Sequence, residues 1–148
     1  MELTYSLWFM MIGSFIIQML VMSRIMTNSS SNITLSVGKF YMSVIMALLM
    51  GLLEVLMYDI HMHMISLYYY VSLFFMLCVF IYLYRNQIYI EDKDYLEEMI
   101  EHHSMAILTS DEILQKSKSE RVKKLAETIL TTQEKEIEYM KQLIKYDI

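Results

Sequence analysis

Three apolar stretches, each about as long as a bilayer is thick, constrain this chain more than any other feature. The first covers 7–26 with no charge before Arg24, the second covers 40–58, and the third covers 65–84 without a charge. A helix rises about 1.5 Å per residue, so about 20 residues cross the roughly 30 Å apolar core of a bilayer. We therefore expect three transmembrane helices in a multi-pass membrane protein.

The composition agrees with this expectation. Of the 148 residues, 56% are hydrophobic, 16 are Met and none is Pro, which is unusual for a soluble domain. The net charge of -5 is concentrated after Arg85, in a segment more acidic than basic, so nucleic-acid binding is not expected. Cys78 is the only cysteine, which excludes an internal disulfide. A cleaved signal peptide is the competing interpretation of the first stretch, but no basic leader precedes it and no small-residue cleavage site follows it.

The second stretch contains the one acidic residue within these apolar segments, Glu54. An acid inside a bilayer costs roughly 3 kcal/mol unless it finds a partner or a polar cavity. The alternative is that Glu54 lies near the membrane boundary, because Tyr58 follows four residues later. Met42, Met46 and Met50 share a helix face here, which favours packing, with a metal-conducting path as the alternative.

The connections between the stretches carry two further signals. The polar loop over 27–38 contains glycosylation patterns at Asn28 and Asn32, which are weak because such triplets are frequent in Ser-rich loops. The next connection offers two imidazoles and two thioethers, so it is a second candidate site for a soft ion such as Cu(I), with an ordinary interfacial turn as the alternative. These residues are His61, Met62, His63 and Met64.

The sequence becomes charged and amphipathic after the third stretch, which predicts a membrane domain over 1–86 and a second domain over 87–148. Two segments with apolar residues at helical spacing meet near Ser117, so we expect two antiparallel helices joined by a short turn. Asp94 or Asp92 is expected to cap the first helix, and a Ser-x-x-Glu capping box beginning at Ser117 is expected to start the second. The predicted fold class is all-α.

One part of the first amphipathic helix combines imidazole, thioether and carboxylate groups. Reflection of the residue numbers about Ser117 places His102 near Gln133, and Met99 near Glu136. Imidazoles and thioethers are the ligands that soft metal ions prefer, so a metal site is one interpretation. A solvated edge is the other, because a two-helix hairpin leaves much of each helix exposed.

Three separated segments resemble the domain-of-unknown-function 305 family. They are Asp94-Tyr-Leu-Glu-Glu-Met-Ile-Glu-His-His-Ser-Met-Ala-Ile107, Arg121-Val-Lys-Lys-Leu-Ala126 and Thr132-Gln-Glu-Lys-Glu-Ile-Glu-Tyr-Met-Lys141. The resemblance implies a ferritin-like helical hairpin and copper binding, which some soluble relatives show. The Met-rich second stretch resembles a membrane-anchored bacterial branch of the family. The functional positions that the resemblance implies are Asp94, Met99, His102, His103, Gln133, Glu136 and Met140.

One departure from the family pattern lies beside the histidine pair. The family commonly has Met-Ile-Pro-His-His, whereas Glu101 stands in the place of the proline. Proline inside a helix removes a hydrogen bond and introduces a kink. A kink in front of the histidine pair is therefore not expected in this chain.

A membrane-tethered module that binds a soft metal ion, copper above all, without a reaction of its own is the leading functional hypothesis. A structural or assembly protein and a metal-conducting oligomer are the alternatives. An enzyme is not expected, because the sequence shows no pair of a nucleophile and a base. We expect lipid and a second copy as partners, because a single hairpin supplies two helices of a four-helix bundle. Arg24, Lys39 and Arg85 favour a cytoplasmic hairpin, whereas the bacterial relatives imply the opposite orientation.

Overall fold

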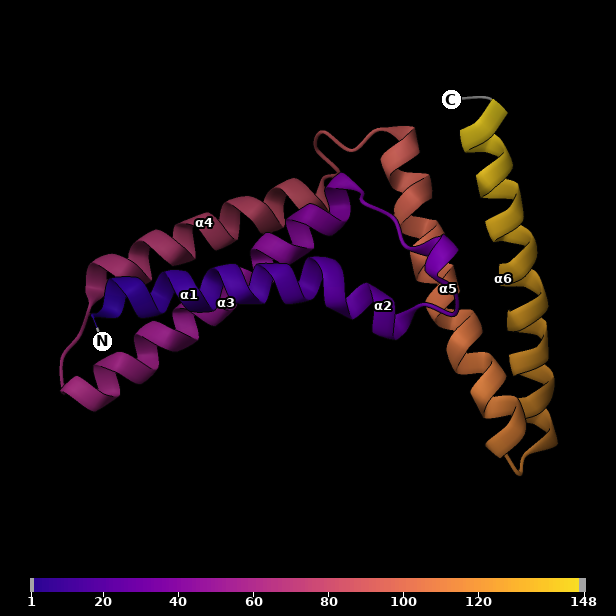
Figure 1. Cartoon of the computed structure of the whole chain (residues 1–148), viewed down its shortest axis with the longest axis horizontal. Helices are drawn as coiled ribbons and strands as arrows, with labels where there is room; N and C mark the ends of the chain where they lie inside the picture. Colours follow the sequence, from indigo (N-terminus) through magenta and orange to yellow (C-terminus); the bar gives the residue numbers. More distant parts are fainter. Residues whose placement is uncertain (1, 147–148) are drawn as a thin grey trace. The chain divides into compact units, whose positions relative to one another are not determined.

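A computed structural model describes residues 2–146 of the chain (Figure 1). All regular elements in this part are helical and no strand occurs in it, so the predicted all-α class is confirmed. The elements are α1 (Leu3–Ile16), the π-helix η1 (Ile17–Met22), α2 (Ser23–Met26), the 3-10 helix η2 (Ser30–Asn32), α3 (Val37–Met62), α4 (Leu67–Arg85), α5 (Asp92–Lys116) and α6 (Glu120–Tyr146).

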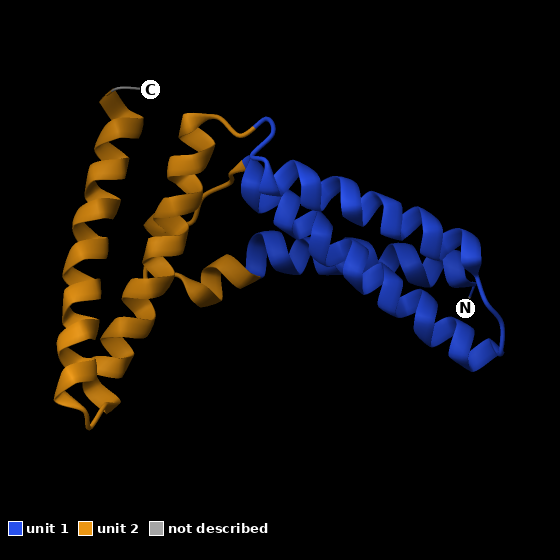
Figure 2. Ribbon diagram, turned by 180° about the vertical axis from the view of Figure 1, so that it is seen from behind, with its two compact units in different colours: residues 1–21, 37–89 blue, residues 22–36, 90–148 orange. Residues whose placement is uncertain are grey.

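The chain divides into two compact units (Figure 2). Unit 1 comprises residues 1–21 and 37–89, and unit 2 comprises residues 22–36 and 90–148. The sequence predicted two consecutive domains that meet after residue 86. The difference concerns 22–36, which belongs to unit 2 because its polar groups are bonded to α5 and α6.

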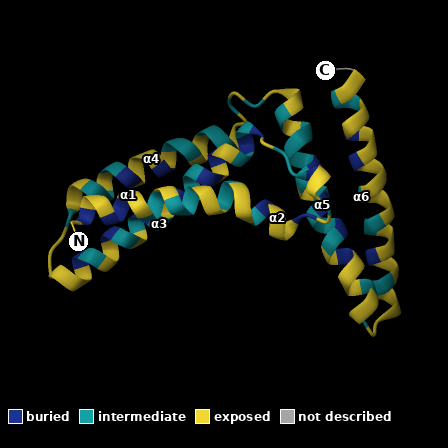
Figure 3. Cartoon of the chain, viewed as in Figure 1, coloured by how far each residue is buried: buried dark blue, intermediate teal, exposed yellow. Residues whose placement is uncertain are grey.

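Three helices are long and apolar enough to cross a membrane: Leu3–Met26, Val37–Met62 and Leu67–Arg85. Large apolar side chains on them point away from the protein, including Phe9 with 76% and Phe75 with 66% of its surface exposed. Figure 3 shows exposed positions, drawn in yellow, along α1, α3 and α4. Soluble proteins rarely expose so much apolar surface, and a bilayer would cover it.

The core of unit 1 lies where α1 and α4 pack against α3. Val55 of α3 is fully buried there, and Gly51 lies one turn before it. A Cβ added at Gly51 would come within 3.0 Å of Met11 Cγ and 3.3 Å of Leu7 Cδ1. The missing side chain therefore lets α1 approach α3 closely. The buried apolar residues of this core are Leu3, Leu7, Leu48, Val55, Leu73 and Leu77.

This contact gives a first testable prediction. Gly51→Leu is expected to destabilise unit 1 by about 1–3 kcal/mol, because the added side chain has to displace residues of α1. Gly13→Leu is the matched control, since a Cβ at Gly13 meets nothing within 4 Å. Thermal unfolding of the detergent-solubilised chain should show a lower midpoint for the first variant only. Equal midpoints would contradict close packing at Gly51.

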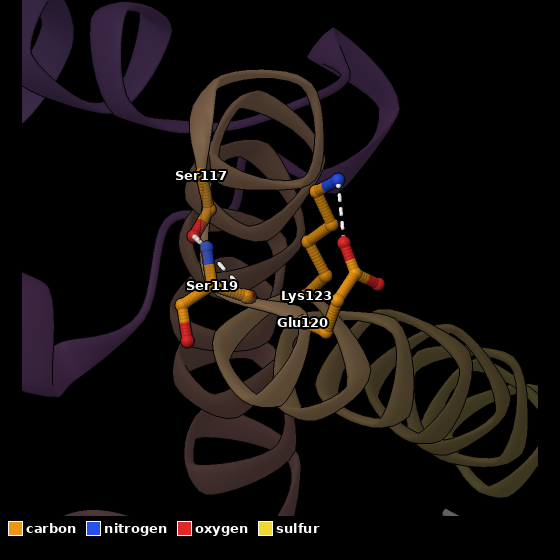
Figure 4. Close-up of polar contacts among 4 residues, drawn as sticks. All are labelled: Ser117, Ser119, Glu120 and Lys123. Atoms are coloured by element: carbon orange, nitrogen blue, oxygen red, sulfur yellow. Dashed lines mark hydrogen bonds and ion pairs between the residues drawn. The ribbon is translucent and has the colours of Figure 1, made fainter.

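The turn between α5 and α6 differs from the predicted capping box (Figure 4). Ser117 ends α5, where its N–H donates to Ile113 O at 2.9 Å and its hydroxyl accepts the N–H of Ser119 at 3.2 Å. Lys123 Nζ lies 3.1 Å from Glu120 Oε1, so this carboxylate does not reach back to Ser117. The predicted box is wrong because Glu120 is the first residue of α6, whereas a capping box uses the third.

Candidate functional site

Helices α5 and α6 together form a helical hairpin. They pack side by side and run antiparallel (Figure 1), around a buried cluster that includes Ile100, Ile107, Ile137 and Met140. The apolar residues of each helix recur at helical spacing along one face, and burial of the two faces against each other accounts for this packing.

One polar contact shows which side chains of α5 and α6 meet across the hairpin. His103 Nε2 lies 2.9 Å from Glu136 Oε2. Reflection about Ser117 would place residue 131 opposite His103, so the residue that His103 contacts lies five positions beyond the one that the reflection gives. Helical side chains lean toward the N-terminus of their own helix, which is away from the turn on α5 and toward the turn on α6. The α6 residue that meets a given α5 side chain therefore lies farther from the turn than the reflection implies.

Glu136 holds the imidazole ring of His103 through one of the two ring nitrogens. A carboxylate only accepts hydrogen bonds, so Nε2 donates to it and the neutral ring carries its lone pair on Nδ1. Nδ1 is buried and is the one buried side-chain nitrogen or oxygen in residues 2–146 without a hydrogen-bond partner. Metal-binding histidines commonly donate their other nitrogen to a carboxylate in this way. The lone pair on Nδ1 is thus the unused acceptor of the hairpin.

Two thioethers lie one turn from the contact between His103 and Glu136. Met99 is one turn before His103 on α5, and Met140 is one turn after Glu136 on the antiparallel α6. Met140 belongs to the buried cluster and Met99 packs against it. The structure therefore places four of the seven predicted positions on one part of the hairpin.

His102 does not share this position. It is exposed, whereas the side chain of His103 keeps only 18% of its surface accessible. The two ring centroids are 6.4 Å apart and the ring planes are inclined by 68°. Adjacent residues of a helix point about 100° apart, which explains why only one imidazole faces α6.

Asp94 also lies apart from His103. The carboxylate of Asp94 accepts the N–H of Glu91 at 3.4 Å, at the start of α5. The predicted cap at Asp94 or Asp92 is wrong, because α5 begins at Asp92 and Glu91 is the cap. Asp94 instead occupies the third helical position, where the second residue of a capping box lies. Gln133 is half-buried, one turn closer to the Ser117 end of α6 than Glu136.

Across the described residues, no three side chains of the types His, Cys, Asp and Glu come close enough together to hold a metal ion. An ion bound between α5 and α6 would therefore need a ligand of another type, and Met99 and Met140 offer thioether sulfur in this part of the hairpin. Thioethers suit soft ions such as Cu(I) and not hard ions such as Mg²⁺.

The second candidate site, at the connection between α3 and α4, is divided. His63 and Met64 line a cavity of about 450 Å³ together with Asp59, whereas His61 and Met62 do not. All four predicted ligands are exposed. Asp59 accepts hydrogen bonds from the N–H and the hydroxyl of Ser66, both at 2.7 Å, just before α4 begins. The connection is therefore ordered by a carboxylate that holds the start of α4.

Glu54 has a partner on a neighbouring helix of unit 1. The hydroxyl of Ser6 on α1 donates to Glu54 Oε1, and Ser6 is buried. This contact agrees with the interpretation in which an acid among apolar helices requires a polar partner.

The methionine stripe of α3 lies on the outside of unit 1. Met42 and Met46 keep 39% and 41% of their surface exposed, and Met50 is half-buried. None of the three belongs to the buried core of this unit. The stripe therefore faces outward, where bilayer lipid would contact it.

Residues 27–36, which we call the strap, bind the hairpin, a contact that no sequence pattern indicated. Ser104 of α5 is fully buried and its hydroxyl donates to Asn28 Oδ1. The same hydroxyl accepts the N–H of Asn28 at 3.0 Å and Nδ2 of Asn32 at 3.3 Å. Lys141 Nζ of α6 donates to Asn32 Oδ1. The amides of both glycosylation patterns thus belong to a polar network that joins the strap to both helices.

A second group of bonds joins the strap to α5 one turn earlier. The N–H of Thr34 donates to Glu101 Oε2 at 3.1 Å, and its hydroxyl donates to the carbonyl oxygen of Glu97 at 2.8 Å. Glu101 is the residue that replaces the family proline. The replacement supplies the acceptor for the strap, and α5 runs through this position as a regular helix. The acid in place of proline was the one sequence signal that could have indicated this contact.

Comparison with known proteins identifies two similarities. A family model described as "Domain of unknown function (DUF305)" matches residues 85–144, which include α5 and nearly all of α6. The chain is also 33% identical over 135 residues to "Uncharacterized protein L153" of Acanthamoeba polyphaga mimivirus, a match that covers 91% of this chain and 88% of that protein. No solved structure matches the chain.

Proposed function

This chain belongs to the DUF305 family, and from that premise we propose that its hairpin is a membrane-anchored module that binds a soft metal ion such as Cu(I). Three helices with the length and composition of membrane spans support the anchor. The hairpin that the family model covers supplies the binding groups. Binding and retention of the ion, without a chemical reaction, is the proposed activity.

The observation that carries the proposal is the buried lone pair of His103. Glu136 holds Nε2, which leaves Nδ1 free to bind an ion without a change in the ring's hydrogen bond. Met99 and Met140 would complete the set with two thioethers. One imidazole and two thioethers form a soft, uncharged ligand set that suits Cu(I). In this arrangement Glu136 orients a ligand and does not bind the ion itself.

A purely structural hairpin is the second candidate function. It is favoured by the packing of Met99 and Met140 against buried isoleucines, because Met fills apolar cores without any metal. In that case the strap and the hairpin would serve to present a surface to a partner. The two candidates differ in what they predict for metal affinity.

Titration of the full-length chain in detergent with Cu(I), in competition with a chelator of known affinity, tests the proposal. His103→Gln keeps a donor for Glu136 but removes the imidazole lone pair, so it should weaken binding at least about tenfold, or 1.4 kcal/mol. His102→Gln is the matched control and should change the affinity less than about twofold. Absence of binding to the wild-type chain, or equal losses in both variants, would contradict the proposal.

The variant His61→Ala with His63→Ala locates any second binding site. If the ion binds only to the hairpin, the affinity of this double variant should equal that of the wild-type chain. Loss of all binding in this variant would move the site to the connection between α3 and α4.

A further inference from the structure

The strap covers one long side of the hairpin and leaves the other side open. It contacts α5 at Glu97, Glu101 and Ser104. On the open side, α5 and α6 enclose an apolar groove with a volume of about 380 Å³ near the turn. Ile113, Val122 and Leu125 line this groove, and Leu125 keeps 60% of its surface exposed.

The open side continues from the groove to the candidate metal site. At about 100° per residue, Leu125, Glu136 and Tyr139 lie within about 60° of one another around α6. Tyr139 keeps 61% of its surface exposed, and Glu136 keeps 49% of its side chain exposed. On α5, Ile113 and His102 lie on this side by the same spacing. This face therefore carries exposed apolar groups near the turn and again at Tyr139, with His102 and Glu136 between them.

Charge is distributed unevenly along the hairpin. Around the turn, residues 116–124 include five basic residues and one acidic residue. At the other end, residues 91–101 include six acidic residues and one basic residue. The two ends of one hairpin are thus complementary to each other in charge, and like ends repel.

We propose that a second copy of this chain covers the open side in the antiparallel orientation. The basic turn of each hairpin then lies against the acidic first part of α5 in the other copy, and each apolar groove receives side chains from its partner. A two-fold interface of this kind uses the same surface twice and closes at two copies. The strap occupies the opposite side, which leaves no equivalent surface for a third copy.

The pairing has a consequence for the candidate metal site, although it does not depend on metal binding. The partner's hairpin would cover the side on which His102 and Glu136 are exposed. Basic residues of the partner's turn would then lie toward the acidic end that contains Met99. The four helices together would shield His103 from water better than one hairpin does.

The mass of the full-length, metal-free chain in detergent, measured by light scattering over a range of concentrations, tests the pairing. The wild-type chain is expected to be a dimer, with weaker association in about 0.5 M salt because charge pairing is screened. Leu125→Glu places a charge in the groove and should weaken the dimer at least about tenfold. Thr131→Glu is the matched control, since Thr131 is exposed on the side of α6 away from the groove. A monomeric wild-type chain, or a dimer that Leu125→Glu leaves intact, would overturn the proposal.

Cross-linking tests the orientation. In a Cys78→Ser background, chains with Leu125→Cys are mixed with chains that carry Tyr95→Cys, an exposed residue near the acidic end. Antiparallel pairing predicts cross-links between the two kinds of chain and few between identical chains with Leu125→Cys. Efficient cross-linking of Leu125→Cys to itself would indicate parallel pairing and overturn the proposal. Both experiments omit metal, so their outcome is separate from that of the titration.

Discussion

Ser104→Val is expected to destabilise unit 2 by about 1–3 kcal/mol. The hydroxyl of Ser104 is fully buried and bonds to the backbone N–H and the side-chain oxygen of Asn28 and to the amide of Asn32. Val lacks the hydroxyl and adds a second branch at Cβ, so the N–H of Asn28 loses its side-chain partner, whereas Asn28 Oδ1 still accepts Nδ2 of Asn32 at 3.0 Å. Each buried polar group that loses its partner costs about 1–3 kcal/mol.

Hydrogen exchange of the full-length chain in detergent provides the measurement, because it reports each unit separately. In Ser104→Val the amides of α5 should exchange faster, while those of α3 and α4 should keep the wild-type rates. Thr109→Val is the control on the same helix, since the exposed hydroxyl of Thr109 bonds only to carbonyls of its own helix. Equal exchange rates in both variants would show that the strap contributes little to the stability of unit 2.

Met99→Leu combined with Met140→Leu is expected to lower the Cu(I) affinity at least about a hundredfold, or 2.7 kcal/mol. Leu cannot bind the ion but fills nearly the same volume as Met, so the hairpin should lose less than about 1.5 kcal/mol of stability. The double variant thus separates the two roles of these thioethers. Ligation predicts a large loss of affinity, and packing predicts none.

Met105→Leu is the control for this experiment. Met105 lies on α5 but is rotated about 120° away from Met99 around the helix, so it points away from the face that carries Met99 and His103. Its replacement should leave the affinity within about twofold of the wild-type value. If Met99→Leu with Met140→Leu behaves like this control, these thioethers are packing residues and the proposed ligand set is wrong.

The parts of the fold that depend on local patterns could be predicted from the sequence. The apolar helices follow from length and composition, and α5 and α6 follow from apolar residues at helical spacing. The strap could not be predicted in this way, because Asn28 and Ser104 are 76 residues apart and their bond leaves no periodic trace. A polar loop rich in Asn and Ser has the same composition whether it is solvated or bonded to a helix.

The candidate site was predicted in its residue types but not in its geometry. The spacing of the apolar residues puts His103 on the apolar face of α5 and His102 about 100° away, and in the structure His103 is the imidazole that contacts α6. The partner of His103 was missed because a reflection of residue numbers follows the backbone, whereas contacts are made by side chains that lean along the helix. The proposed role of Glu136 in orienting His103 could be inferred only from the contact that the structure shows.

The order of synthesis gives the strap a further consequence. Its residues emerge from the ribosome before α3 and α4, while their partners on α5 and α6 emerge after both. If α3 and α4 are membrane spans, the strap and the hairpin meet only when both of these helices have inserted. A chain in which one of them fails to insert would have the strap and the hairpin on opposite sides of the bilayer, and every bond to Ser104, Glu101 and Lys141 would be lost. The folding of the hairpin would in that way report whether the membrane topology is correct.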